Sequence, residues 1–245
     1  MSNKNQINIS DIQKKLSDKL LDTNGYNTEW YNALNHFLTK SEFTDILEKL
    51  LYEVEQGKRF VPKIKNILNA FVECDLKDLK VVIIGQDPYP WLYKNHPDGT
   101  VADGLAFSCG NSMKIQPSLE YIYNGMNKPI EDRNPDLKYL ANQGVLLLNS
   151  ALTVEVNKPG THYHIWKPFI NIVIDTINYN KSDIVFILLG KVAQQFEDMI
   201  SDKHHILKAS HPASAGYNKG VWDCNDIFNK TNQYLEQKDK TVIQW

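Results

Sequence analysis

Four polar segments of this 245-residue chain each directly follow an apolar run, and they contain the side chains best suited to chemistry. The first holds a carboxylate, Asp87, and the last holds an imidazole, His211, beside proline and small residues. A carboxylate and an imidazole are the groups that most often serve in acid–base and electrostatic catalysis. Each also has a structural alternative, because Asp87 could cap a turn amide and a lone histidine is more often structural. We take Asp87 and His211 as the candidate catalytic pair.

Three further features fit a site that binds a flat, polar ligand. Pro88 fixes φ and stiffens the loop that carries Asp87, which suits a carboxylate that must be held in place. Asn149 ends another apolar run, and its amide can donate and accept at once, as reading a base edge requires. Phe107 is either a core residue or a stacking platform for a ring. The alternative for Asn149 is an amide that ties two loops together.

Motifs of several common enzyme classes are absent from the sequence. It contains no G-x-x-x-x-G-K-[ST], no G-x-G-x-x-G and no G-x-S-x-G, which weakens ATPase, dinucleotide-binding and α/β-hydrolase interpretations. The pair His162 and His164 suggests a metal site, but no cysteine or carboxylate stands nearby at ligand spacing. Three separate cysteines without a C-x-x-C pair indicate reduced thiols and no structural zinc.

The elements that must position these residues follow from hydrophobic periodicity. Four apolar runs alternate with helical patterns, which is typical of a parallel sheet covered on both faces. We expect strands at Val81–Ile84, Val145–Leu148, Ile184–Leu189 and His205–Lys208, and helices at Pro117–Asn127, Leu137–Gln143, Trp166–Asn178, Lys191–Ile200 and Asn225–Gln237. Earlier helices are expected at Asp11–Leu21, with Ser10 as N-cap, at Glu42–Gln56 and at Pro62–Val72. The fold class is α/β, a single domain (1–245) with a central four-stranded parallel sheet flanked by helices. Because sites form at the carboxyl ends of parallel strands, the four polar segments should meet in one cleft.

Composition limits the classes of protein further. With 27 basic and 29 acidic residues the net charge is −2, which excludes a globally basic nucleic-acid coat but leaves room for a local basic groove. The longest apolar run, Ile184–Leu189, is too short to cross a bilayer, and the N-terminus lacks a signal-peptide core. We therefore expect a protein that acts away from membranes and is not secreted.

Five motifs, in order, resemble the family 1 uracil-DNA glycosylases. Residues 85–89 (GQDPY) resemble the family's water-activating loop, and residues 104–108 (GLAFS) its uracil-stacking segment. Residues 116–120 (QPSLE) resemble its proline-rich phosphate loop, and residues 144–154 (GVLLLNSALTV) its uracil-reading strand. Ser210, His211 and Pro212 stand where its minor-groove loop begins. The resemblance covers residues 60–245 and leaves 1–60 as a helical N-terminal segment.

The resemblance implies a metal-independent enzyme, without a cofactor, that flips uracil out of DNA and hydrolyses its N-glycosidic bond, which initiates base excision repair. Asp87 would position the water and stabilise a cationic sugar, and a neutral His211 would donate to the uracil O2. The implied uracil-binding residues are Gln86, Tyr89, Phe107 and Asn149, with Tyr89 rejecting thymine. The implied DNA-binding residues are Pro88, Ser118, Gly190, Lys191, Pro212, Ala213, Ser214 and Ala215.

Several positions depart from the family pattern. Ala215 stands where a bulky leucine usually fills the hole left by the flipped base, so Trp91 or Tyr217 could act as the wedge instead. Residues 90–103 form a longer loop than usual, in which Trp91 and Tyr93 touch DNA or a partner or pack on the loop itself. Pro90, Gly190-Lys191 and residues 211–213 (HPA) resemble the poxvirus enzymes, which also serve as polymerase processivity subunits.

These departures keep other functions open. A DNA-binding subunit with weak catalysis is the second hypothesis, and a metal-dependent nuclease using Asp87 and histidines is the third. The expected partners are uracil-containing single- or double-stranded DNA and a replication or repair protein, with no membrane, and the expected state is a monomer. The expected location is the cytoplasm in a prokaryote, and the nucleus or a viral replication site otherwise.

Overall fold

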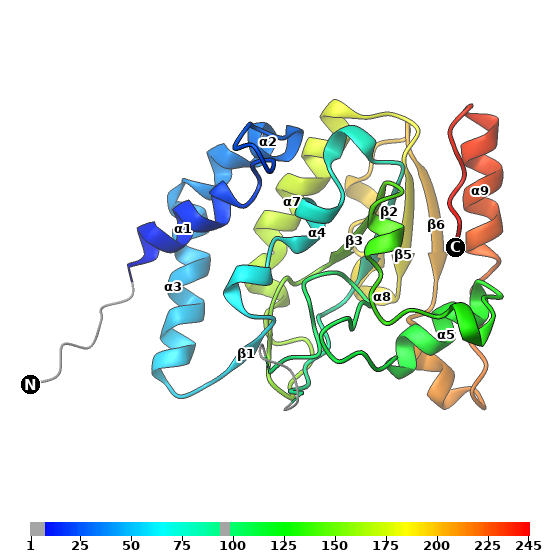
Figure 1. Cartoon of the computed structure of the whole chain (residues 1–245), viewed down its shortest axis with the longest axis horizontal. Helices are drawn as coiled ribbons and strands as arrows, with labels where there is room; N and C mark the ends of the chain where they lie inside the picture. The colour runs from blue at the N-terminus through cyan, green and yellow to red at the C-terminus, as the bar shows by residue number, and fades with distance from the viewer. Residues whose placement is uncertain (1–7, 94–98) are drawn as a thin grey trace, which may run out of the picture.

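A four-stranded parallel sheet with the order β3-β2-β5-β6 lies at the centre of the molecule (Figure 1). The computed structural model describes residues 8–93 and 99–245. The strands are β2 (Val81–Gly85), β3 (Val145–Asn149), β5 (Val185–Leu189) and β6 (His205–Ala209). Every residue of the first three strands is buried, as expected for strands covered on both faces. The predicted fold class and its four strands are confirmed.

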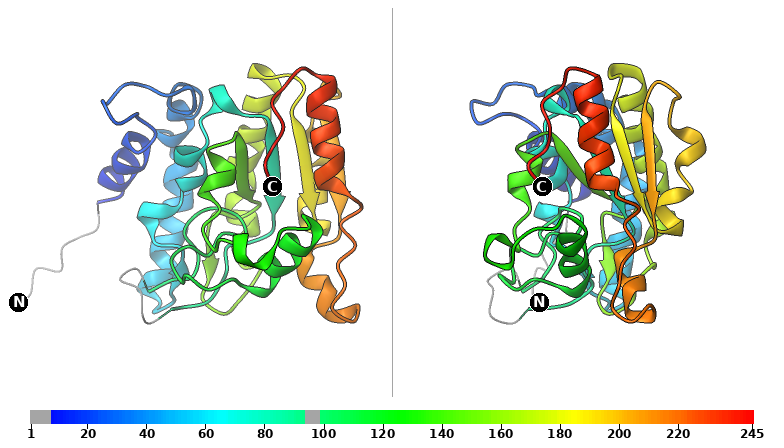
Figure 2. Two further views of the ribbon diagram at one scale, coloured as in Figure 1. Left: turned by 45° about the vertical axis from the view of Figure 1, so that its right-hand side comes forward. Right: turned by 90° about the vertical axis from the view of Figure 1, so that its right-hand side faces the viewer.

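Helices cover both faces and one end of this sheet (Figures 1 and 2). They are α1 (Ile9–Asp18), α2 (Glu29–Leu38), α3 (Ser41–Glu55), α4 (Asn69–Glu73), α5 (Pro117–Gly125), α6 (Lys138–Ala141), α7 (Tyr163–Asn180), α8 (Lys191–Gln194) and α9 (Ile227–Gln237). Helices α1, α2 and α3 pack on one another, and α2 and α3 also pack on α7. Helices α4 and α6 lie against β3, and α9 lies against β5 and β6.

Short elements complete the fold. Strands β1 (Phe60–Val61) and β4 (Val154–Glu155) form an antiparallel ribbon in which Val61 faces Val154. Single 3-10 turns occur at η1 (Ile64–Asn66), η2 (Leu76–Asp78), η3 (Ile130–Asp132) and η4 (Glu197–Met199), and a longer one at η5 (Pro212–Tyr217). The ribbon matters for function because β4 runs directly into the loop before α7.

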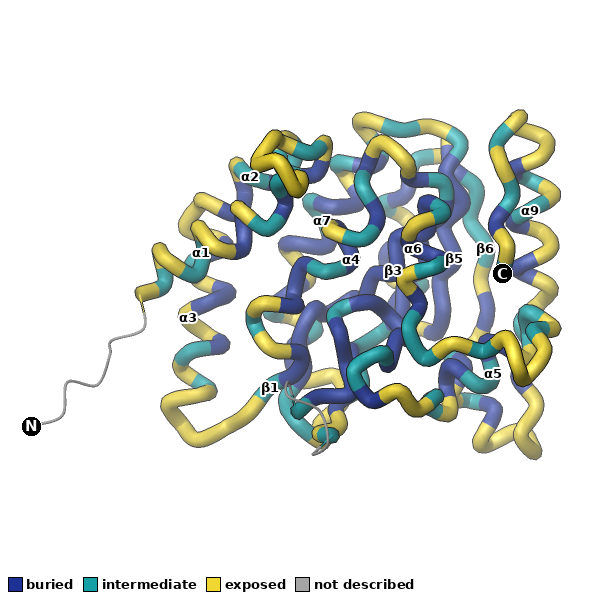
Figure 3. The backbone as a smooth tube through the Cα atoms, in the orientation of Figure 1, coloured by how far each residue is buried: buried dark blue, intermediate teal, exposed yellow. Residues whose placement is uncertain are grey.

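The core is continuous from the sheet to the N-terminal helices (Figure 3). Aromatic rings join the two parts, since Phe43 of α3 contacts Trp166 and Phe169 of α7 with ring centroids 6.3 and 6.2 Å apart. Trp166 and Phe169 are fully buried. This packing fixes α3 against α7, and α7 against the sheet, in one apolar interior.

Several sequence-based helix predictions differ from the structure. Ser10 is not the N-cap of α1, because the helix begins at Ile9 and is capped by Asn8, whose side chain accepts from the Ser10 amide. The prediction missed α2, although Thr28 caps it by accepting from the Tyr31 amide. The predicted helix at Pro62–Val72 is instead η1 followed by the short α4, and the one at Lys191–Ile200 is broken between α8 and η4. The helix predicted at Leu137–Gln143 is observed only as the shorter α6. The observed α7 is longer at both ends than the predicted helix at Trp166–Asn178.

No helix in the described ranges, 8–93 and 99–245, combines the length and apolar character that a membrane span requires.

Candidate active site

The loops at the carboxyl ends of the parallel strands surround one pocket of about 390 Å³. Parallel register brings these ends level, with Gly85 beside Asn149 and Leu189 beside Ala209. In Figure 2, α5 and the segment after β6 lie at the end of the sheet toward which the arrows point. The pocket is lined by Gln86, Asp87, Pro88, Tyr89, Pro90, Trp91, Phe107, Pro117, Ser118, Pro159, His211 and Ala213. A larger hollow of about 760 Å³ between α2 and α7 is lined by none of the candidate catalytic side chains.

The carboxylate of Asp87 is held through one of its two oxygens. Oδ2 accepts from the side-chain amide of Gln86 at 2.8 Å and from the backbone amide of Gly160 at 2.7 Å. Oδ1 is buried and has no hydrogen-bond partner among the described residues. A buried carboxylate oxygen without a partner is costly, and a bound water or substrate would satisfy it. Burial raises the pKa of Asp87, and the two hydrogen bonds lower it by a smaller amount.

The imidazole of His211 has a defined tautomer. Its Nδ1 accepts from the backbone amide of Ala213 at 3.2 Å, so Nδ1 carries no proton and the proton of the neutral ring is on Nε2. Burial lowers the pKa of His211, which keeps the ring neutral near pH 7. Gly190 is required behind the ring, because a Cβ at that position would lie 2.9 Å from the Cβ of His211. The site therefore presents a neutral N–H donor.

Phe107 and Asn149 both pack against Gly85 at the end of β2. An added Cβ on Gly85 would come within 3.0 Å of both the Phe107 ring and the Asn149 Oδ1, so only glycine allows this close packing. Phe107 has a φ of +64°, a strained conformation for a bulky residue. Its ring lies 5.8 Å from that of His211. Strain of this kind persists only where the surrounding structure enforces it, and it concentrates at functional sites.

The rim of the pocket contains the positions predicted to contact DNA. Ser118 lies in the first turn of α5, whose N-terminus borders the pocket and favours an anion. Ala213 is exposed, but Pro212 and Ala215 are buried, and Ala215 has no exposed surface. The side chain of Ala215 therefore offers no surface to DNA in this conformation, and its predicted contact with DNA stays a prediction.

The turn after His211 exposes an aromatic side chain instead. Tyr217, at the end of η5, is 97% exposed. The carbonyl of Ala215 accepts from the amides of Asn218 and Gly220, both at 2.9 Å, which pins the chain on either side of this side chain. The Trp222 indole donates to the Ser210 carbonyl at 3.0 Å and anchors the whole turn beside the site.

Comparison with known proteins shows the family to which this chain belongs. A family model described as the uracil DNA glycosylase superfamily matches residues 71–236. The chain belongs to this superfamily. It is 40% identical to a uracil-DNA glycosylase of Francisella philomiragia over 88% of this chain and 98% of that one. It is 37% identical to a uracil-DNA glycosylase of Acinetobacter baylyi, with 88% and 90% covered. The crystal structure of mimivirus uracil-DNA glycosylase superposes with a TM-score of 0.80 at 25% identity, covering 98% of this chain and 89% of that chain.

The structure of this family member brings most of the predicted site residues together. Gln86, Asp87, Pro88, Tyr89, Phe107, Ser118, His211 and Ala213 line the one pocket. Asn149 is buried beside Phe107, and Gly190 supports His211 from behind. Lys191, Pro212, Ser214 and Ala215 do not line the pocket. Trp91 lines the rim at 46% exposure, whereas residues 94–98 of its predicted loop lie outside the described part of the chain.

Two functional residues were missed by the sequence analysis. Pro159 lines the pocket, and Gly160 supplies the amide that holds Asp87. The Pro-Gly pair between a strand and a helix signals a turn, but nothing in the sequence indicates that this turn reaches a loop seventy residues away. Across the described ranges, no cluster of three or more histidine, cysteine or acidic residues could hold a metal ion.

Proposed function

We propose that this protein hydrolyses the N-glycosidic bond of deoxyuridine in DNA, releases free uracil and leaves an abasic site for base excision repair. One observation carries the proposal: Asp87, His211 and Phe107 face one pocket at the carboxyl edge of the sheet, each held by its own contact. The relatives named as uracil-DNA glycosylases, at 37–40% identity over most of both chains, support the same activity.

Asp87 and His211 would divide the reaction between the two sides of the breaking bond. As the bond between uracil N1 and the sugar C1′ breaks, positive charge develops on the sugar and negative charge on the base. The ionised Asp87 would stabilise the sugar and orient the water that attacks C1′. The Nε2–H of His211 would donate to the uracil O2 as that oxygen gains charge, which is oxyanion stabilisation by a preorganised donor.

The remaining pocket residues would select the base. The ring of Phe107 would stack on uracil, and the amide of Asn149 would read its N3 and O4 edge. Tyr89 lines the pocket and would exclude the methyl group of thymine. Gln86 donates its side-chain amide to Asp87 here, so its predicted contact with uracil would compete with that bond.

DNA would approach across the rim. A base inside a duplex must be flipped out before it reaches Asp87, and unstacking is cheapest in single strands. Ser118 and the α5 N-terminus would receive a phosphate, and Lys191, exposed at the start of α8, would add charge. Tyr217 is the exposed side chain placed to fill the gap in the duplex, because Ala215 is buried.

The deciding experiment measures free uracil released from matched uracil- and thymine-containing oligonucleotides, single-stranded and duplex, with EDTA present. The proposal expects release from the uracil substrates alone, unchanged by the chelator. Asp198→Asn, at an exposed carboxylate, is the matched control for Asp87→Asn. Activity that disappears with EDTA would favour the metal-dependent nuclease. Tight DNA binding without release would favour the DNA-binding subunit.

Finer features of the protein's context are also proposals. We propose a monomer that acts on single- and double-stranded DNA and works beside a replication or repair protein, without a membrane. A mimivirus relative has been solved in complex with UGI, at 26% identity and a TM-score of 0.80, so a protein partner can bind that protein. The molar mass of the purified protein, measured by light scattering, tests the proposal that it is a monomer. We also propose that the protein acts in the cytoplasm if it is prokaryotic, and in the nucleus or at a viral replication site otherwise.

A further inference from the structure

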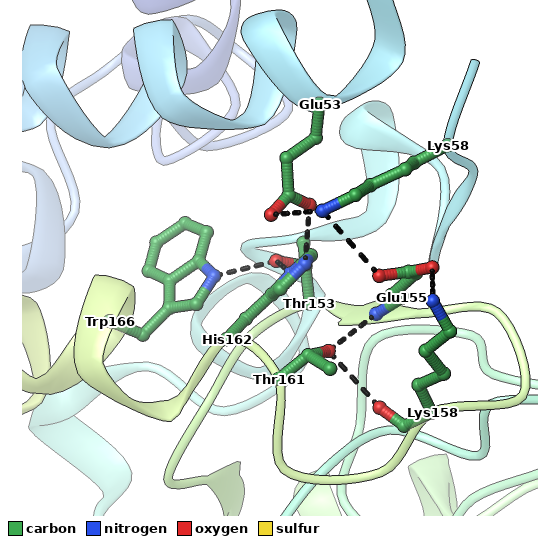
Figure 4. Close-up of polar contacts among 8 residues, drawn as sticks. All are labelled: Glu53, Lys58, Thr153, Glu155, Lys158, Thr161, His162 and Trp166. Atoms are coloured by element: carbon green, nitrogen blue, oxygen red, sulfur yellow. Dashed lines mark hydrogen bonds and ion pairs between the residues drawn. The ribbon is translucent and has the colours of Figure 1, made fainter. Parts of the chain in front are cut away.

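A chain of hydrogen bonds links Glu53 of the N-terminal helix α3 to His162 and Trp166 at the start of α7 (Figure 4). At its centre is His162, which is fully buried at the start of α7. Its Nε2 lies 2.9 Å from Oε2 of Glu53 in α3, and its Nδ1 lies 2.8 Å from Oγ1 of Thr153. The indole of Trp166 donates to the same Oγ1 at 2.7 Å. Glu53 lies outside the segment that the family model matches.

The direction of each hydrogen bond in this series follows from which atoms can donate. An indole N–H can only donate, so Thr153 Oγ1 accepts from Trp166. The Glu53 carboxylate can only accept, so Nε2 of His162 carries a proton, and in the neutral ring Nδ1 is the acceptor for the Thr153 hydroxyl. That Nε2–H donates to the Glu53 carboxylate. Burial lowers the pKa of His162 despite the carboxylate beside it, which agrees with a neutral ring. Every polar atom of the buried ring is thereby satisfied.

This chain of hydrogen bonds reaches His162, which is two residues from a backbone amide that contacts Asp87. Gly160, whose amide donates to Asp87 Oδ2 at 2.7 Å, is joined to His162 through Thr161 alone. Gly160 is itself exposed, and its φ of +84° places it in a tight turn. An exposed amide is held in place only by the residues that anchor its turn. The buried His162 is the anchor on the α7 side.

A second set of contacts anchors the other side of the same turn. The Glu155 amide donates to Thr161 Oγ1 at 3.0 Å, and Thr161 Oγ1 donates to the Lys158 carbonyl at 3.0 Å. Lys58 bridges Glu53 and Glu155 at 3.3 and 3.7 Å, at a more exposed position. Exposed ion pairs of this kind contribute little to stability, whereas the His162–Thr153 bond is buried and the His162–Glu53 bond is partly buried. The contacts of His162 should therefore dominate in holding the turn.

We propose that Glu53, His162 and Thr153 are positioning residues, which set the Gly160 amide against Asp87 and so fix the orientation of the catalytic carboxylate. The proposal rests on the uracil-releasing activity proposed above and adds a role for the N-terminal helices. It predicts that a change in α3, which does not line the pocket, alters the chemical step and not the affinity for DNA.

The test compares Glu53→Ala with Glu53→Gln, which keeps an oxygen that can accept from His162 Nε2. Glu53→Ala should lower kcat on a single-stranded uracil oligonucleotide by about 10-fold with little change in KM, since small misplacements of catalytic groups are costly. Because the Gly160 bond lowers the pKa of Asp87, the acid limb of the kcat profile should also move to higher pH. His162 is the other titratable group whose charge acts on Asp87, and its own neighbours are Glu53 and Glu155. Glu53→Gln should restore most of kcat and return the acid limb of the kcat profile to its wild-type position.

Two controls separate this route from general destabilisation. Glu48→Ala removes an exposed glutamate of the same helix, and Lys58→Met removes the exposed ion pairs but keeps the His162 bond. Both should retain the wild-type kcat and pH profile, and thermal melts show that each variant is folded. Equal loss of kcat in Lys58→Met and Glu53→Ala would overturn the proposal, as would an unchanged acid limb in Glu53→Ala.

A readout that does not depend on activity completes the test. In the wild-type protein, the NMR resonance of the Gly160 amide should titrate with Asp87, because the two are directly bonded. Glu53→Ala should reduce the amplitude of this titration. An unchanged amplitude would contradict the positioning role even if the protein released no uracil, whereas a reduced amplitude in an inactive protein would place the failure in the proposed function alone.

Discussion

Replacing His211 with alanine should remove one preorganised hydrogen-bond donor from the reaction and little else. The structure specifies that donor, because the Ala213 amide occupies Nδ1 and leaves Nε2–H toward the pocket. The loss of one donor of this oxyanion-stabilising kind costs about 10²–10³-fold in kcat, or about 2.7–4 kcal/mol. We expect the single-turnover rate of uracil release by His211→Ala to fall by this factor, while the Kd for uracil-containing DNA changes little.

The pH dependence of the same variant tests the assigned tautomer. Burial lowers the pKa of His211, so the wild-type ring stays neutral across the neutral range and its titration should not shape the profile there. His211→Ala should therefore lower the rate equally at pH 6.5 and pH 8. His205→Ala, at a half-buried histidine of β6, serves as the control. A loss below 10-fold, or a loss that grows as His211 would ionise, would refute the neutral-donor role.

Five other outcomes follow from the site. The acid limb of the kcat/KM pH profile should lie at a pH above the ordinary pKa of an aspartate, because burial raises the pKa of Asp87. An acid limb at or below that ordinary pKa would contradict this expectation. Since the folded pKa is raised, ionised Asp87 destabilises the fold above that pKa, and Asp87→Asn should melt higher than wild type at neutral pH, with the difference vanishing below the unfolded pKa. Tyr217→Ala should slow uracil excision from duplex DNA by about 5–150-fold, through the loss of about 1–3 kcal/mol of stacking, and leave excision from single strands unchanged. Ala215→Leu should lower only the melting temperature of the protein, because the side chain of Ala215 is buried. Tyr89→Ala should release thymine from thymine-containing oligonucleotides, and continued refusal would remove its steric role.

The central sheet and the meeting of its loops were predictable because they depend on local patterns. Runs such as Val145–Leu148 are apolar at every position, which only a strand buried on both faces requires. Once the strands are parallel, their carboxyl ends share one edge, so Asp87 and His211 lie at the same edge of the sheet. The prediction that they share a pocket follows from topology and was confirmed.

The errors arise where tertiary contacts override local signals. The burial of Ala215 and the exposure of Tyr217 two residues later are set by the turn after His211, which the sequence does not reveal. Gly160 and Glu53 could not be assigned from sequence, because their contacts with Asp87 and His162 join segments 73 and 109 residues apart. The sequence analysis discounted a metal site at His162 and His164, but it gave no indication that His162 is a buried link between Thr153 and Glu53.

The most direct test of the account is single-turnover release of uracil by wild type and Asp87→Asn from one single-stranded oligonucleotide, with EDTA present and binding measured in parallel. Asparagine keeps an oxygen for the Gly160 amide but loses the charge. The account predicts metal-independent release by wild type and a rate about 10²–10⁴-fold lower in Asp87→Asn, with DNA affinity retained. Equal rates in the two proteins would contradict the assignment of Asp87 as the catalytic carboxylate.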